Sequence, residues 1–130
     1  MKPADDFSHD IIGAAVEVQR LLGTGLPESA YAAALAIELG EREIGFAQDV
    51  SLSAEYKGKP LGALRRADFI VEHAVLVQVK AIDSNSEQQR TEALAALRLS
   101  GLTLGLLINF NVFPVVKGVY RLVNKARAEA

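Results

Sequence analysis

The chain has 130 residues, enough to bury a hydrophobic core, so we expect residues 1–130 to form a single domain. Half of the residues are hydrophobic and 23% are charged, which excludes a disordered protein. Cysteine is absent, which excludes disulfides and thiolate metal sites and favours a reducing, cytoplasmic location. The net charge of −2 provides no general attraction to nucleic acid.

The sequence predicts neither a membrane span nor a secretory leader. Its most apolar run, "LTLGLLINF", is less than half as long as the roughly 20 residues of a membrane helix. The first residues, "MKPADDFSHD", are polar and acidic and lack the apolar centre of a leader. Either of the two groups of cations, taken alone, is typical of a solvated surface. These groups are Lys57, Lys59, Arg65 and Arg66, and Lys117, Arg121, Lys125 and Arg127.

Two helices are predicted at the start of the chain. Apolar residues recur at helical spacing over 5–22, with Glu17 off their stripe and therefore on the surface. The glycines of "GTGLPES" end this helix. Pro27 suits a first helical turn, so a second helix is expected over 27–43.

The rest of the chain is expected to form strands and one further helix. The predicted strands are 46–57, 61–72, 75–82, 102–110 and 115–123. The first two are joined by the turn signal "KGKP", and the fourth is buried on both faces because it is continuously apolar. A helix begins within "DSNSEQQR" and runs to about Leu99, and the tail "NKARAEA" is a short helix or frayed. This order predicts an α/β fold whose mixed central sheet is flanked by helices.

The third strand, within "AVLVQVKA", carries two polar residues on a face that would otherwise be apolar. Strand residues alternate between faces, so Gln78 and Lys80 project together. Asp68 lies in the middle of the preceding strand, where aspartate is disfavoured. The short "EHA" connection pairs these two strands, so we expect Asp68 beside Gln78 and Lys80.

A second carboxylate is expected opposite this face. Glu28 shares a helical face with Tyr31 and Leu35, so its side chain should point toward the sheet rather than toward water. The acids and the lysine are the residue types of a divalent-metal site for phosphodiester cleavage. Two structural alternatives stay open: Glu28 caps its helix, and Lys80 forms an ion pair with Asp68.

Three blocks of sequence, in order, resemble one family. "GLPESAY" matches the pattern G-x-x-E-x-x-Y, and "ADFIVEHAVLVQVKA" and "LRLSGLTLGLLINFN" follow it. The chain resembles, over about 10–123, the GxxExxY proteins of the PD-(D/E)XK nuclease superfamily.

The resemblance implies a nuclease-like core and a set of site residues. Asp68 would be the main ligand of Mg²⁺ or Mn²⁺, with the Gln78 side chain and the Val79 carbonyl as further ligands. Glu28 would complete the metal shell, and Lys80 would position the water and stabilise the negative charge on phosphorus. The implied partner is nucleic acid, DNA in the first place.

The sequence departs from the family pattern at three positions. The acid of E-x-K is Gln78, and the glutamine and tyrosine expected on the next helix are Glu92 and Ala96. Tyr31 and Glu92 are accessory candidates. Three readings therefore stay open: a metal-dependent nuclease, a nuclease-fold module that binds nucleic acid or protein without cleavage, and a homodimer formed through a sheet edge or the first helix.

Overall fold

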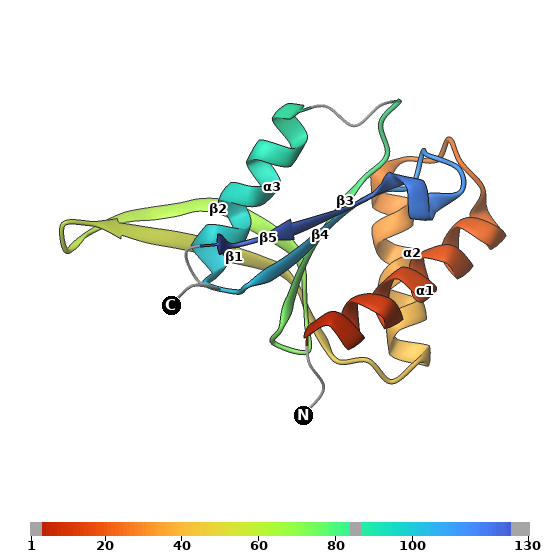
Figure 1. Cartoon of the computed structure of the whole chain (residues 1–130), viewed down its shortest axis with the longest axis horizontal. Coiled ribbons are helices and arrows are strands. Elements are labelled where there is room, and N and C mark those ends of the chain that lie inside the picture. The colour runs from red at the N-terminus through yellow and green to blue at the C-terminus, as the bar shows by residue number, and fades with distance from the viewer. Residues whose placement is uncertain (1–3, 84–86, 126–130) are drawn as a thin grey trace.

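The computed structural model describes residues 4–83 and 87–125 (Figure 1). Its elements are α1 Ala4–Leu22, α2 Glu28–Glu41, β1 Phe46–Tyr56, β2 Lys59–Val71, β3 Val75–Lys80, α3 Glu87–Ser100, β4 Leu104–Asn109, η1 Val115–Gly118 and β5 Val119–Val123. The predicted α-α-β-β-β-α-β-β order is confirmed, with the short 3-10 helix η1 added. Most of the predicted tail, residues 126–130 with Arg127, lies outside the described residues.

The strand predicted over 115–123 is wrong in its first four residues, which form η1. Val115 is buried and its backbone N–H donates to Oε1 of Gln19 on α1, at 2.8 Å. Gly118 lies so close to β4 that a Cβ there would approach the carbonyl oxygen of Asn109 to 2.5 Å. This segment is therefore folded tightly onto α1 and β4, and β5 begins only at Val119.

The five strands lie in chain order in one mixed sheet. The pairs β1–β2, β2–β3 and β4–β5 are antiparallel, and β3–β4 is parallel. A parallel pair needs a long crossover, and α3 forms part of it. As predicted, β4 is buried along its whole length.

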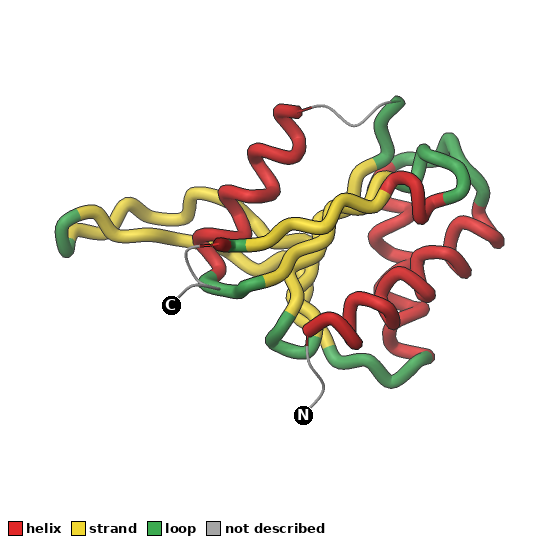
Figure 2. Tube along the Cα trace, viewed as in Figure 1, coloured by secondary structure: helices red, strands yellow, loops and turns green. Residues whose placement is uncertain are grey.

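The helices cover both faces of the sheet, α1 and α2 on one side and α3 on the other (Figures 1 and 2). Val75, Val77 and Val79 of β3 pack in the core with α1 and α2. Leu76 packs instead with Ala96 and Leu97 of α3. Alternation along β3 therefore places Gln78 and Lys80 on the α3 face.

The distal halves of β1 and β2 extend beyond the body of the molecule as a two-stranded arm (Figure 2). Every residue from 55 to 66 is exposed. The predicted turn is confirmed at its tip, where Lys57 and Gly58 both have positive φ, 50° and 79°. Two such residues in succession are typical of the type I′ turn that joins twisted hairpin strands.

No helix in the described part of the chain is long and apolar enough to cross a membrane.

Candidate functional site

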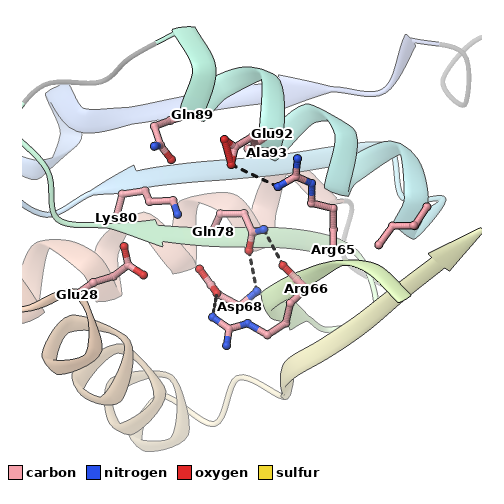
Figure 3. Close-up of a pocket in the computed structure, with 10 residues that line it drawn as sticks. Glu28, Arg65, Arg66, Asp68, Gln78, Lys80, Gln89, Glu92 and Ala93 are labelled. Atoms are coloured by element: carbon pink, nitrogen blue, oxygen red, sulfur yellow. Dashed lines mark hydrogen bonds and ion pairs between the residues drawn. The ribbon is translucent and has the colours of Figure 1, made fainter. Parts of the chain in front are cut away.

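The site is built where β2 and β3 separate. Their ladder ends at the pair Phe69–Val77, and side chains bridge the strands beyond it. The backbone N–H of Asp68 donates to Oε1 of Gln78 at 2.7 Å, and the backbone N–H of Val79 donates to Oδ2 of Asp68 at 2.8 Å. Nε2 of Gln78 also donates to the carbonyl of Arg66, at 2.9 Å (Figure 3). Backbone atoms therefore hold both side chains in place.

A cavity of about 390 Å³ opens at this separation, on the α3 side of the sheet. Five of the predicted site residues line it: Glu28, Asp68, Gln78, Lys80 and Glu92. A second cavity of about 290 Å³ lies on the α2 side and shares Glu28, Arg66 and Asp68 with the first. Asp68 therefore stands at the boundary between two cavities, and residues from α2, β2, β3 and α3 meet at one place.

Glu28 lies at the cavity, but the expectation that it points away from water is wrong. It is the first residue of α2 and is exposed, one turn before the buried Tyr31. Its side chain forms no hydrogen bond or ion pair with another described residue, so it does not act as a helix cap there. Figure 3 shows its carboxylate facing the same space as Asp68 and Lys80.

Lys80 is half-buried on the cavity wall. None of the ion pairs between described residues joins Lys80 to Asp68, so that alternative is wrong. Asp68 pairs instead with Arg66, whose Nη2 lies 3.0 Å from Oδ1 of Asp68. Nε of the same arginine lies 3.5 Å from Oδ1 of Asp49. Among the described residues no carboxylate pairs with Lys80, so its ammonium remains available to a ligand in the cavity (Figure 3).

Glu92 reaches the cavity from α3. Its Oε1 lies 3.3 Å from Nη1 of Arg65, and this ion pair joins α3 to β2 across the cavity. Ala96, one turn later, is fully buried against the sheet. Of the two positions at which the family pattern has glutamine and tyrosine, position 92 therefore lies at the cavity and position 96 lies in the core.

Sequence reasoning did not assign five of the cavity residues: Leu64, Arg65, Arg66, Gln89 and Ala93. A signal existed for three of them. Arg65 and Arg66 belong to the cationic group just before Asp68, and Gln89 lies three residues from Glu92 on one helical face. Both arginines border the cavity and pair with carboxylates there, Arg65 with Glu92 and Arg66 with Asp68.

A sequence model described as the PD-(D/E)XK nuclease superfamily matches residues 5–122. The chain belongs to this superfamily. The matched range contains every predicted site residue, and superfamily nucleases generally use divalent metal ions. No curated protein and no solved structure matches the chain.

In this superfamily member, Val79 and Tyr31 do not line the larger cavity. The Val79 side chain is buried with α1 and α2, and the residue borders only the smaller cavity. The Tyr31 hydroxyl donates to the carbonyl of Gly23 at 2.7 Å and accepts from the backbone N–H of Leu26 at 3.2 Å. Its ring stacks on Phe110 at a centroid distance of 4.9 Å. Tyr31 therefore holds the loop that leads into Glu28.

The carboxylate oxygens at the cavity fit a divalent cation that takes its remaining ligands from water and from a bound phosphate. Asp68 and Glu28 supply two carboxylates, and Mg²⁺ is usually bound by one or two carboxylates together with waters and phosphate oxygens. Each carboxylate oxygen of Asp68 accepts one bond and retains a second lone pair. No three Asp, Glu, His or Cys residues of the described ranges form a group that would hold a metal by themselves.

Proposed function

We propose that the protein is a nuclease of the GxxExxY group that hydrolyses phosphodiester bonds of nucleic acid, DNA in the first place, in the larger cavity. One observation supports this most strongly. Lys80 and Glu28, neither paired with another described residue, line the same cavity as Asp68. Lys80 is half-buried and Glu28 is exposed, and both lie at one concave surface. A lysine and a carboxylate without partners are the groups that a phosphodiester and a cation would bind.

Each side chain has a role that follows from its position. Arg65 and Arg66 border the cavity and bind the phosphates on either side of the cleaved bond. The Lys80 ammonium stabilises the negative charge that develops on the phosphoryl oxygens and orients the attacking water. Asp68 is held by the backbone N–H of Val79, so its carboxylate keeps one orientation when substrate binds.

Asp68 and Glu28 are the residues that would hold Mg²⁺ or Mn²⁺, with the Gln78 and Val79 oxygens as further candidates. When bound, the cation polarises the phosphate and lowers the pKa of a bound water. The oxygen of Gln78 already accepts a bond from Asp68, so it has one lone pair left for this role.

A second candidate function is a nuclease-fold module that binds nucleic acid or a protein without cleaving it. The hydrogen bonds of Gln78 favour this alternative. Its amide accepts from Asp68 and donates to the carbonyl of Arg66, so it bridges the two strands as a structural group. An amide also leaves the site with one negative charge fewer than an E-x-K acid would provide.

The test is cleavage of labelled single- and double-stranded DNA with Mg²⁺ or Mn²⁺ by the wild type, Lys80→Ala and Gln78→Glu. A matched control is Lys117→Ala, which removes a lysine from η1, outside both cavities. Cleavage by the wild type and Lys117→Ala, lost in Lys80→Ala, supports the nuclease. Activity that appears only in Gln78→Glu supports the module that binds without cleavage. Absence of cleavage in all four proteins contradicts the first proposal.

A further inference from the structure

The exposed arm, residues 55–66, concentrates positive charge. It contains four cationic residues and one acid, Glu55, whereas the whole chain has 14 cationic and 16 acidic residues. In the rest of the chain, acidic residues therefore clearly outnumber cationic residues. A phosphate backbone would be attracted to this arm more than to the rest of the surface.

The cations occupy both ends of the arm. Lys57 and Lys59 lie at its tip, and Arg65 and Arg66 lie at its base on the cavity wall. At about 3.3 Å per strand residue, the tip lies roughly 20 Å from the cavity. A nucleic acid whose backbone enters the cavity would therefore pass along the arm.

The two lysines at the tip are available for a ligand. Neither forms an ion pair with another residue of the described ranges, whereas Arg65 and Arg66 pair with carboxylates. Nζ of Lys57 lies 5.4 Å from the centre of the Tyr56 ring, and Tyr56 is 62% exposed. The tip thus presents two ammonium groups and an aromatic ring to the solvent.

The shape of the arm favours one kind of nucleic acid. It is a two-stranded antiparallel ribbon, and the major groove of B-form DNA is wide enough to admit such a ribbon. The major groove of an A-form RNA duplex is too narrow for side chains to read. Charge and shape together therefore point to duplex DNA.

We propose that the arm binds double-stranded DNA beside the cavity, with Lys57 and Lys59 in contact with backbone phosphates. This rests on the proposed function, because it takes the ligand of the arm to be the substrate of the cavity. Leu61 and Leu64 are also exposed on β2, by 53% and 47%, and a second copy of the chain is the competing occupant.

The experiment measures affinity for a fluorescent DNA duplex without divalent metal, so binding is read apart from cleavage. The variant is Lys57→Asn/Lys59→Gln. Asparagine tolerates the positive φ at position 57, so the turn is kept while two charges are removed. The control is Lys117→Glu, which changes the net charge by the same amount in η1. Lys59→Gln alone is a second variant that leaves the turn residues unchanged.

The arm variant should bind the DNA duplex more weakly than the wild type, and its affinity should depend less on salt concentration. The salt slope is the steepness with which the logarithm of the affinity falls as the logarithm of the salt concentration rises, and two lost phosphate contacts lower it by about 1.8. Between about 50 and 200 mM salt the wild type should therefore lose about tenfold more affinity than the variant. Lys59→Gln should lower the slope by about half as much. Lys117→Glu should keep the slope of the wild type.

Three results would overturn the proposal. One is the same affinity and slope in the wild type and the arm variant. Another is equal binding of an RNA duplex of the same sequence. The third is a change in molar mass by light scattering with unchanged DNA binding, which would assign the arm to a second copy of the chain. If the arm variant binds DNA more weakly, as expected, but neither the wild type nor any variant cleaves DNA, the result would contradict only the proposed cleavage.

Discussion

The backbone N–H of Asp68 donates a 2.7 Å hydrogen bond to the side-chain oxygen of Gln78, at the point where the ladder between β2 and β3 ends. The amide nitrogen of Gln78 donates in turn to the carbonyl of Arg66. An amide is able to accept from one backbone group and donate to another, whereas an ionised carboxylate only accepts. The departure from an acid at this position therefore has a structural role in joining the separating strands.

Gln78→Glu should strengthen metal binding and weaken the fold slightly. The added negative charge lies beside Asp68, so we expect Mn²⁺ affinity to rise by about tenfold or more, equivalent to about 1.4 kcal/mol. The carboxylate cannot donate to the carbonyl of Arg66, so the free energy of unfolding should fall by about 1 kcal/mol without metal. Calorimetric titration with Mn²⁺ and urea unfolding measure the two effects.

The control for this variant is Thr91→Glu, which adds a carboxylate to α3 at an exposed position outside both cavities. It should leave Mn²⁺ affinity unchanged. Equal affinities in the wild type, Gln78→Glu and Thr91→Glu would show that position 78 does not border a metal site.

Asp68 combines a structural and a chemical role, and two substitutions separate them. Asp68→Asn keeps an oxygen that accepts from the backbone N–H of Val79, so it should cost less than about 1 kcal/mol of stability. Asp68→Ala leaves that N–H without a partner and should cost about 1–3 kcal/mol. Both should abolish cleavage, because both remove the negative charge. Urea unfolding and the DNA cleavage assay give the two readouts.

Equal destabilisation by the two substitutions would contradict this separation. It would mean that the ion pair with Arg66, which both variants lose, holds Asp68 instead of the bond from Val79.

Regular parts of the chain could be predicted from local pattern. Alternation along β3 placed Gln78 and Lys80 on one face, because the strand is regular there and its valines face α1 and α2. The same kind of argument failed for Glu28. A helical face predicts burial only where the sheet lies beneath it, and α2 begins one turn before that point.

The rest of the site depends on contacts between distant segments. The bond from the backbone N–H of Val79 to Asp68 depends on the separation of β2 and β3, which no local pattern encodes. The ion pair of Asp68 with Arg66, two residues away on the same strand, is by contrast one that strand alternation alone could predict. The position of Glu92 depended on which face of α3 meets the sheet, and the burial of Ala96 and Leu97 decides it. Likewise, η1 replaced strand because Gln19, far away in sequence, binds the backbone of Val115.

The ion pair between Glu17 and Arg20 on α1 predicts a pH effect away from the site. Hydrogen bonds of 2.7 and 2.8 Å from Arg20 hold the pKa of Glu17 below its usual value of 4.5. A lowered pKa in the folded state stabilises the protein above pH 4.5, and this contribution is lost as the pH falls through the lowered pKa. Arg20→Gln should therefore raise the pKa of Glu17 toward 4.5, as measured by NMR titration of its carboxyl group.

Arg98→Gln, which changes an exposed arginine on α3, is the control and should leave the pKa of Glu17 unchanged. High salt should raise this pKa in the wild type, since both groups of the ion pair are accessible to solvent. A pKa that stays low in Arg20→Gln would assign the shift to another cation.

Tyr31→Phe should weaken the loop that positions Glu28. The hydroxyl bonds the carbonyl of Gly23 and the backbone N–H of Leu26, and the variant removes both bonds but keeps the stacking on Phe110. We expect a loss of about 1–2 kcal/mol in stability, or about 4 °C in melting temperature per kcal/mol. Cleavage should also fall, because Glu28 follows this loop directly. Tyr56→Phe, at an exposed residue, should leave the melting temperature unchanged. Full cleavage activity with a lowered melting temperature would show that the loop stabilises the fold without positioning Glu28 for the reaction.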